Sequence, residues 1–239
     1  FFDVLKEMMR GRSIQSFSSR NKICFKMNQE LKKGCGCCYE SFEIGPGKNE
    51  RHPFFTNEGL EKLIESSFRS LHSLTLKSCF LLTESGFLLI ARATHLIELH
   101  MSKAKNFTDN CFIDIIRNCR FLRKVTLNNC SSLTSKALNF LLNDFTGIEV
   151  LDLSENKGVF EEFRSFSGFK RMLMLRELNL SHTSIPLEHL RTIIASLPNL
   201  ESLYLEGYKT ITKEFIDGVQ DVQKLSILTI YLKTPPKNK

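Results

Sequence analysis

A short pattern of apolar residues recurs along this chain, and no other feature restricts its fold as strongly. Each copy has an apolar residue at its first, fourth and sixth positions. Seven copies begin at Leu71, Leu96, Leu122, Ile148, Leu175, Leu200 and Leu225. The intervals between them are 25, 26, 26, 27, 25 and 25 residues. So constant a period predicts a stack of similar structural repeats.

The second half of most copies predicts a helix. Two segments carry apolar residues at helical spacing, namely Phe112, Ile115, Ile116, Cys119 and Leu138, Leu141, Leu142, Phe145. An apolar residue followed by threonine precedes these segments and their counterparts, and we expect each threonine to cap the following helix: Thr83, Thr108, Thr134 and Thr212. Each repeat therefore predicts a strand of about five residues, a turn, and a helix of about ten.

A single repeat of this kind cannot bury its own apolar side, so neighbouring repeats must cover it. We therefore expect an α/β leucine-rich-repeat solenoid, a ribonuclease-inhibitor-like horseshoe with a parallel sheet on its concave side and helices on its convex side. The ninth position holds Cys79, Cys130 or Asn156 in three repeats. We expect these side chains to fill the turn and to satisfy backbone groups between coils.

The repeats divide the chain into three parts. Residues 39–232 are predicted to form the leucine-rich-repeat domain of seven to eight repeats. Its degenerate first repeat takes its strand from Tyr39, Phe42 and Ile44, a loop from Gly45–Pro53 and a helix from Phe55 onward. Residues 1–38 are expected to be a basic capping or linking segment with a short amphipathic helix at Phe2–Met9, and residues 233–239 a basic tail.

The repeat resembles the cysteine-containing leucine-rich repeat, with matches at Cys130–Leu138, Phe107–Cys119 and Leu197–Leu200. The resemblance covers about residues 55–232. Such repeats occur in F-box leucine-rich-repeat proteins, which are substrate receptors of ubiquitin ligases. They also occur in the yeast antagonist of the mitotic exit network and in ciliary dynein regulatory complex subunits.

The resemblance implies a non-enzymatic protein-interaction module that recognises a protein partner. Two roles stay open: the substrate-recognition part of an SCF-type ubiquitin ligase, or a structural subunit of a large assembly such as a ciliary complex. Residues 1–38 lack the Leu-Pro opening and the Cys/Trp close of an F-box. If an F-box lies upstream, the resemblance implies a Skp-type adaptor as a partner.

Polar residues between the framework leucines should point to the concave face, because side chains alternate along a strand. We expect the partner to bind there, on Lys77, His100, Lys103, Lys124, Asn128, Asp152, Glu155, His182, Tyr204 and Glu206. Lysines come early and carboxylates late, which predicts a charge gradient that would steer a partner. A merely solvated sheet face is the alternative. Neither histidine has an evident carboxylate partner, so no catalytic site is expected.

Charge and hydropathy exclude some classes of function. The net charge is +7, but residues 1–38 contribute +5 of it from eight cations and three anions. A nearly neutral body with basic ends is not typical of nucleic-acid binding. No apolar run approaches the length of a membrane-spanning helix.

The eight cysteines favour a reduced intracellular location, which we expect to be the cytoplasm, with a cytoskeletal or ciliary site left open. Four of them lie in the periodic apolar pattern, where free cysteine acts as a small core residue. The cluster Cys35, Cys37 and Cys38, with Cys24 and His52, could suggest zinc, but its spacing lacks a C-x-x-C pair. We therefore expect no metal and no cofactor.

Overall fold

The computed structural model describes residues 24–28, 41–45, 55–67, 69–208, 211–212, 214–215, 218 and 229–231. The chain forms two compact units, treated separately below. Unit 1 comprises Phe1–Leu122 with Cys130–Ser132, and unit 2 comprises Arg123–Asn129 with Leu133–Lys239. The segment Phe2–Met9, the cluster Cys35, Cys37 and Cys38, and the tail 233–239 lie outside the described residues.

Unit 1 contains four strands in sequence order, β1 (Cys24–Asn28), β2 (Ser41–Gly45), β3 (Ser73–Lys77) and β4 (Glu98–Ser102). The strands β2, β3 and β4 are parallel, and Phe42, Leu74 and Leu99 lie opposite one another. Strand β1 runs antiparallel to β2. Residues 1–38 include β1, which pairs with the first parallel strand. We therefore propose that this segment caps the repeats.

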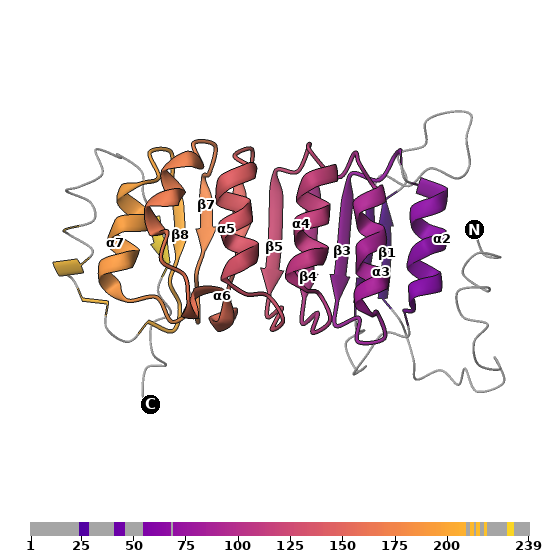
Figure 1. Cartoon of the computed structure of the whole chain (residues 1–239), viewed down its shortest axis with the longest axis horizontal. Coiled ribbons are helices and arrows are strands. Elements are labelled where there is room, and N and C mark those ends of the chain that lie inside the picture. Colours follow the sequence, from indigo (N-terminus) through magenta and orange to yellow (C-terminus); the bar gives the residue numbers. More distant parts are fainter. Residues whose placement is uncertain are drawn as a thin grey trace. The chain divides into compact units, whose positions relative to one another are not determined.

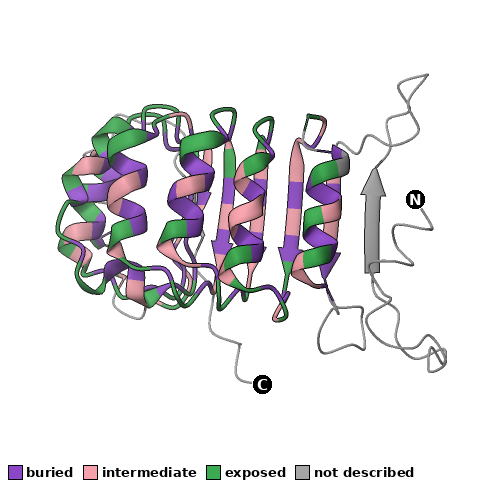
Figure 2. Cartoon of the chain, turned by 45° about the vertical axis from the view of Figure 1, so that its right-hand side comes forward, coloured by how far each residue is buried: buried purple, intermediate pink, exposed green. Residues whose placement is uncertain are grey.

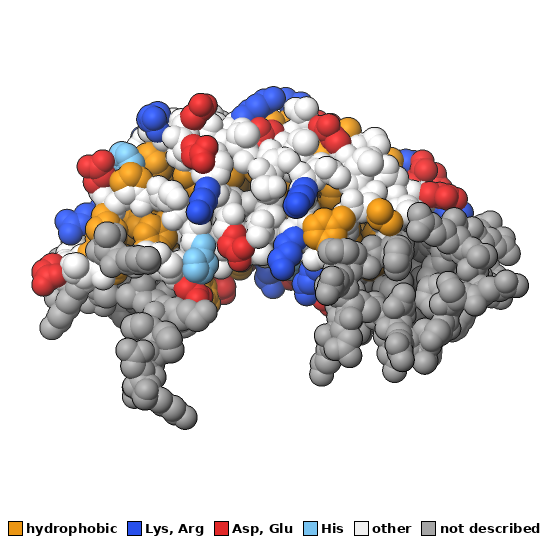
Figure 3. Space-filling view, turned by 90° about the horizontal axis from the view of Figure 1, so that it is seen from below, with side chains coloured by type: hydrophobic (Ala, Val, Ile, Leu, Met, Phe, Trp, Pro, Cys, Tyr) orange, Lys and Arg blue, Asp and Glu red, His pale blue; other side chains and the backbone are white. Residues whose placement is uncertain are grey.

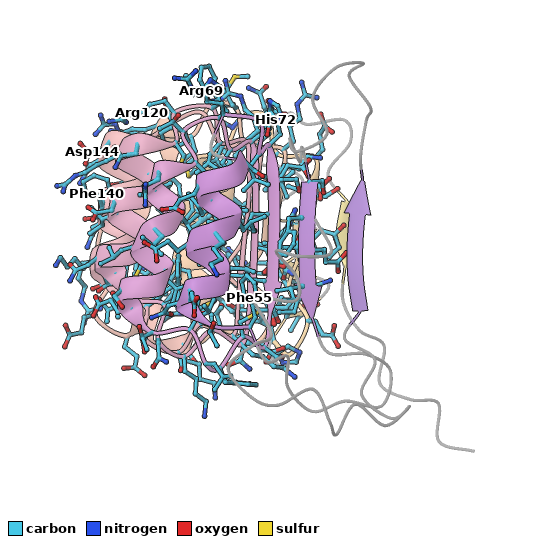
Figure 4. The ribbon with its side chains drawn as sticks, turned by 90° about the vertical axis from the view of Figure 1, so that its right-hand side faces the viewer. Phe55, Arg69, His72, Arg120, Phe140 and Asp144 are labelled. Atoms are coloured by element: carbon cyan, nitrogen blue, oxygen red, sulfur yellow. The ribbon has the colours of Figure 1, made fainter. Side chains whose placement is uncertain are left out.

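Helices cover one side of the unit 1 strands (Figures 1 and 4). They are α2 (Asn57–Ser67), α3 (Glu84–Leu88), the 3-10 helix η2 (Leu89–Arg92) and α4 (Asp109–Asn118). Strand β2 and helix α2 form the degenerate first repeat that the sequence predicts. The expected strand residues Phe42 and Ile44 are buried there.

Unit 2 repeats the same alternation of strand and helix. Its strands β5 (Lys124–Asn128), β6 (Val150–Asp152), β7 (Glu177–Asn179), β8 (Ser202–Tyr204) and β9 (Thr229–Tyr231) are all parallel. Its helices are α5 (Ser135–Asp144), α6 (Lys157–Glu161), the 3-10 helix η3 (Phe166–Arg171) and α7 (Leu187–Ala195). Both units have the α/β leucine-rich-repeat solenoid fold.

The framework residues form the core between the strands and the helices of each unit. Leu74, Leu76 and Leu99 in unit 1, and Leu151, Leu178 and Leu203 in unit 2, have no exposed surface. Figure 2 shows this pattern, with buried residues alternating along the strands and facing inward on the helices. Both predicted helical stripes are fully or almost fully buried. The repeat period was therefore read correctly as a stacking period.

The ninth position closes each strand turn as predicted. The buried amide of Asn156 donates through Nδ2 to the carbonyl oxygens of Leu127, Leu153 and Ser154. In another repeat the Thr183 hydroxyl donates to the Leu180 carbonyl at 2.7 Å, and its oxygen lies 2.5 Å from the Tyr208 hydroxyl. Cys79 and Cys130 are buried at the same position. Asn156 and Thr183 thus donate to carbonyl groups in and beside their turns.

The threonines lie at the helix starts as predicted, but their expected capping bonds form only in part. Thr134 Oγ1 accepts from the Lys136 N–H at 3.2 Å, and Thr212 Oγ1 accepts from the Phe215 N–H at 3.4 Å. Thr108 instead donates to Glu84 Oε1 of the preceding repeat at 2.6 Å. Thr83 is bound by the Asn57 side chain of the preceding helix. A side chain from the neighbouring repeat therefore competes with the local cap.

Two repeats lack the ten-residue helix that the sequence predicts. In unit 1, α3 has five residues and continues as η2. In unit 2, α6 has five residues and is followed by η3, in a repeat whose buried rings are spaced three residues apart: Phe160, Phe163, Phe166 and Phe169. The spacing of three residues between Phe166 and Phe169 matches the 3-10 helix η3. Edge-on contacts between these rings fill this part of the core; the ring centroids of Phe163 and Phe166, for example, are 4.9 Å apart.

In the described part of the chain, no helix is both long and apolar enough to cross a membrane.

Candidate protein-binding surface

The strand side chains that point away from the helices form what we call the open face of each unit. In unit 1 this face carries Ser73, Thr75 and Lys77 on β3, and Glu98, His100 and Ser102 on β4. All six are partly or largely exposed, whereas the intervening leucines are buried. The strand alternation thus places the predicted residues Lys77 and His100 where the sequence analysis expected them.

Acidic side chains that the sequence analysis did not select accompany both residues. Lys77 Nζ lies 2.7 Å from Glu43 Oε1 on the neighbouring strand β2. His100 Nε2 lies 3.9 Å from Glu98 Oε2, and Ser73 Oγ donates to the same oxygen at 3.2 Å. Glu98 precedes His100 by two residues, so the period of the strand already put both on one face. At 3.9 Å this contact is longer than a hydrogen bond.

In unit 2, Asp152 organises the centre of the open face. Its Oδ1 accepts from the Ser154 backbone N–H at 2.8 Å and from the Ser154 hydroxyl at 2.5 Å. Its Oδ2 accepts from Asn179 Nδ2 at 3.0 Å. Asn179 repeats the motif, since its Oδ1 accepts from the Ser181 N–H at 3.0 Å. These bonds occupy both oxygens of Asp152, so this predicted binding residue also holds the strand end in shape.

Two asparagines hold Glu155 beside this centre. Asn129 Nδ2 donates to Glu155 Oε2 at 2.8 Å, and Asn128 Nδ2 contacts Glu155 Oε1 at 3.4 Å. Asn128 Nδ2 also donates to Ser154 Oγ at 2.9 Å. The carboxylate of Glu155 is nonetheless exposed. The structure therefore brings the predicted residues Asn128, Asp152 and Glu155 into one hydrogen-bonded group.

His182 and Glu206 lie together near the end of the open face of unit 2. His182 Nε2 is 3.9 Å from Glu206 Oε1, an ion pair only when the imidazole is protonated. The His182 backbone N–H donates to the Glu206 carbonyl at 2.7 Å. The contact between the two side chains is longer than a hydrogen bond. This pair was not evident from the sequence, because Glu206 lies in the next repeat and one position before the counterpart of His182.

One repeat position, directly after β3, β4 and β5 and three residues after β6, β7 and β8, has an unexpected backbone conformation. Ser78, Lys103, Asn129, Glu155 and His182 all have φ between 53° and 61°, and Gly207 has φ of 87° at the same repeat position. The N–H groups of four of them, among them Asn129, Glu155 and His182, donate to a carbonyl of the next repeat. The predicted residues Lys103, Glu155 and His182 thus project from left-handed turns rather than from extended strand.

The remaining predicted residues also reach the surface of unit 2. Lys124 is exposed, and Tyr204 and Glu206 are partly exposed. Figure 3 views the chain from the side on which the strands end, and shows basic and acidic side chains mixed there. Lys77 and Lys103 belong to unit 1, whereas Lys124, Asp152, Glu155 and Glu206 belong to unit 2. A charge gradient between the two groups stays a prediction.

The buried cysteines lack the properties of a nucleophile. Burial raises the pKa of the Cys79 and Cys119 thiols from the usual 9.0 to about 12. Burial also raises the pKa of Cys111. All three are free thiols in the core, as is Cys130. Thiols in this environment stay protonated at neutral pH and act as core residues.

Among the described residues, no group of three or more His, Cys, Asp or Glu side chains could hold a metal ion. The cysteine cluster that raised the zinc question is Cys35, Cys37 and Cys38, which is outside that part.

Comparison with known proteins identifies the fold but no family. No family model and no curated protein matches the chain. A chain from the crystal structure of the Rad7 and Elc1 complex in yeast is similar over 74% of this chain, with 18% identity and a TM-score of 0.55. The matched region is 44% of that chain. A chain from the TLR13–ssRNA13 complex is similar over 65% of this chain and 24% of its own length, with 20% identity and a TM-score of 0.43.

Proposed function

We propose that this chain is a protein-interaction module that binds its partner on the open face of its strands. The observation that carries the proposal is the contrast between the two sides of each strand. Leucines on one side are buried against helices, whereas the other side presents charged, amide and hydroxyl groups at every repeat. Solenoids commonly bind partners on such surfaces. A fixed backbone with variable exposed side chains suits recognition more than catalysis.

The unit 2 open face offers the sharpest candidate contacts. Tyr204 supplies a partly exposed aromatic ring on strand β8, two residues before Glu206, and aromatic residues are enriched at binding hot spots. The hydrogen bonds around Asp152 hold the strand ends, so that the exposed groups are already positioned before a partner arrives. Preorganisation of this kind lowers the entropic cost of binding.

The finer role that we propose is substrate recognition in an SCF-type ubiquitin ligase. Its support is the resemblance of the repeats to those of F-box leucine-rich-repeat proteins. The similarity in fold to a chain of the Rad7 and Elc1 complex, itself a protein assembly, is consistent with a protein partner. In this role a Skp-type adaptor would be a second partner, and the chain would act in the cytoplasm.

Affinity capture tests the proposal. The tagged chain is used as bait in cell extract, and captured proteins are identified by mass spectrometry. The double variant Tyr204→Ala with Glu206→Lys should reduce recovery of the partner about tenfold, because one contact is removed and one charge is reversed. The control Lys157→Glu with Glu161→Lys changes exposed charges on helix α6 and should leave recovery unchanged.

The same captured fraction separates the roles. A Skp-type adaptor and a cullin among the captured proteins would support the ligase role. Their absence beside a specific protein partner would favour a structural subunit. Equal recovery with the open-face variant and the wild-type chain would contradict the proposed binding face.

A further inference from the structure

The edge at which the unit 1 strands begin has a distinctive composition. Three short segments, 69–72, 92–97 and 117–122, lead from its helices to the following strands. They contain no Asp or Glu but hold four arginines and two histidines. Figure 4 shows Arg69, His72 and Arg120 together at this edge. We call it the arginine edge, with its cationic residues Arg69, His72, Arg92, His95, Arg117 and Arg120 and its apolar residues Ile97 and Phe121.

Two large apolar side chains are exposed between these cations. Phe121 is 56% exposed and Ile97 is 36% exposed. The His95 ring stacks on Phe121, with ring centroids 6.0 Å apart and an interplanar angle of 16°. The N–H groups of Ile97 and Glu98 both donate to the His72 carbonyl, which fixes the backbone that carries Ile97. The apolar centre of the edge is thus held in place although water covers it.

The matching edge of unit 2 balances its own charges. Arg123 and Glu149 stand at the repeat position of Ile97, and Arg123 Nε lies 3.6 Å from Glu149 Oε1. Arg176 and Glu201 occupy the same position in the next two repeats, with Nη1 and Oε1 2.7 Å apart. Arginine and glutamate therefore alternate along that edge. In the unit 1 segments the acidic half of this alternation is missing.

Helix stability explains only part of this composition. Arg92 and Arg117 lie in the last turns of η2 and α4, where a cation is favourable near the helix C-terminus. Arg117 also lies 3.8 Å from Asp114 of the same helix. Arg69 and Arg120, however, follow the helices, and a helix dipole does not favour exposure of Phe121 and Ile97. Apolar residues within a rim of charge are typical of interaction surfaces.

We propose that the arginine edge binds an acidic protein segment that carries a large apolar side chain. Carboxylates of the segment pair with Arg92 and Arg120, and its apolar side chain covers Ile97 and the free face of Phe121. Single-stranded nucleic acid fits less well, because Ile97 offers no ring for a base to stack on and His95 covers one face of Phe121. This inference rests on the proposed function and names a second contact surface for a protein partner.

A synthetic peptide tests the edge directly. The probe is a fluorescein-labelled peptide of glutamates with a central Leu-Phe pair, titrated with the full chain by fluorescence anisotropy. We expect micromolar binding that weakens as salt is raised, because exposed charge pairs are screened. Replacing the Leu-Phe pair with Ser-Gly should weaken binding about tenfold. An oligothymidylate of equal charge serves as the nucleic-acid probe.

Variants locate the binding. Arg92→Glu with Arg120→Glu should weaken peptide binding about tenfold or more, and Phe121→Ser about fivefold. The matched control, Arg171→Glu with Met174→Ser, changes an exposed arginine and an exposed apolar residue at the unit 2 edge and should leave binding unchanged. Thermal unfolding of each variant establishes that it is folded.

Several results would overturn the inference. One is the absence of peptide binding at concentrations below about 1 mM, and another is binding that is equally tight without the central Leu-Phe pair. The inference would also fail if the unit 2 control variant lost as much peptide affinity as the edge variants, or if oligothymidylate bound more tightly than the peptide. The edge variants could lose peptide binding and still capture the partner normally in the affinity-capture assay. That result would support the inference. Failure of partner capture with intact peptide binding would count against the proposed function alone.

Discussion

At the scale of single residues, one repeat position combines a left-handed backbone with a side chain that differs between repeats. Its members are Ser78, Lys103, Asn129, Glu155 and His182. Five residues other than glycine adopt left-handed φ there. A left-handed conformation costs an ordinary residue about 1 kcal/mol or more, and the backbone N–H bonds to the next repeat offset that cost. The sequence gives no sign of this, because Ser, Lys, Asn, Glu and His share no property that demands positive φ.

Asn156 supports the first residue-scale prediction. Its buried Nδ2 donates to three carbonyl oxygens in and beside its turn. Asn156→Ala should lower the free energy of unfolding by about 2–3 kcal/mol, because buried carbonyls lose their donors. Urea denaturation followed by circular dichroism measures this loss.

The control for this prediction is Asn143→Ala. Asn143 is exposed on helix α5. The bond described for its side chain is one that Oδ1 accepts from exposed Arg171 at 3.3 Å. Its replacement should change the free energy of unfolding by less than about 0.5 kcal/mol. If both variants were equally stable, Asn156 would have no structural role in the turn.

At the scale of secondary-structure elements, neighbouring helices are joined through their first turns. Asn57 at the start of α2 binds both the N–H and the hydroxyl of Thr83, and Glu84 accepts from Thr108. Gly86 makes the first contact possible, because a Cβ there would lie 2.1 Å from Asn57 Oδ1. These bonds tie α3 to α2 and α4 to α3, in addition to the shared apolar core.

The Glu84–Thr108 contact can be measured by a double-mutant cycle. Thr108→Val and Glu84→Ala should each destabilise unit 1, but together by less than the sum, with a coupling free energy of about 1 kcal/mol. Thr108→Val combined with Glu58→Ala is the control, since Glu58 pairs with Lys62 within α2. Additive losses for both pairs would mean that Thr108 acts only as a local helix cap.

The helices also show where prediction from sequence succeeds and where it stops. Threonine before an apolar stripe correctly located the helix starts at Thr83, Thr108 and Thr134. The partner of each hydroxyl could not be predicted, because it depends on how the preceding repeat packs. The short helices α3 and α6 were missed for a similar reason.

At the scale of the whole molecule, the repeat period predicted the fold correctly, since each framework leucine had a counterpart about 26 residues away. Ten candidate binding residues came from the same alternation, and all have some exposed surface. Prediction did not locate the contact of Glu98 with His100 within one strand, or that of Glu206 with His182 in adjacent repeats. It also missed the arginine edge, whose residues lie at helix ends and in the loops that the repeat pattern treats as connections.

Alkaline pH should destabilise the molecule through two buried thiols. The pKa of Cys79 and Cys119 is about 12 in the folded chain and 9.0 for an ordinary thiol. Below pH 9 both states keep these protons, so the stabilising effect is complete. As pH rises from 9 toward 12, the unfolded chain releases them first, and each thiol lowers the free energy of unfolding by about 1.4 kcal/mol per pH unit.

Urea denaturation between pH 8 and about 10.5 tests this dependence. The double variant Cys79→Ala with Cys119→Ala lacks both thiols, so its stability should decline less steeply than that of the wild-type chain. Tyrosine and lysine titration affects both proteins alike and cancels in the comparison. Parallel curves for the two proteins would show that these cysteines ionise equally easily in the folded and unfolded states.

The shared left-handed turn has a consequence for how such a protein can change its partner. Backbone bonds, not side chains, set the geometry there, and the side chains at Lys103, Glu155 and His182 all reach solvent. Mutation at these sites can therefore replace one recognition group with another while the scaffold stays intact. Evolution, or an engineer building a library, could alter specificity one coil at a time.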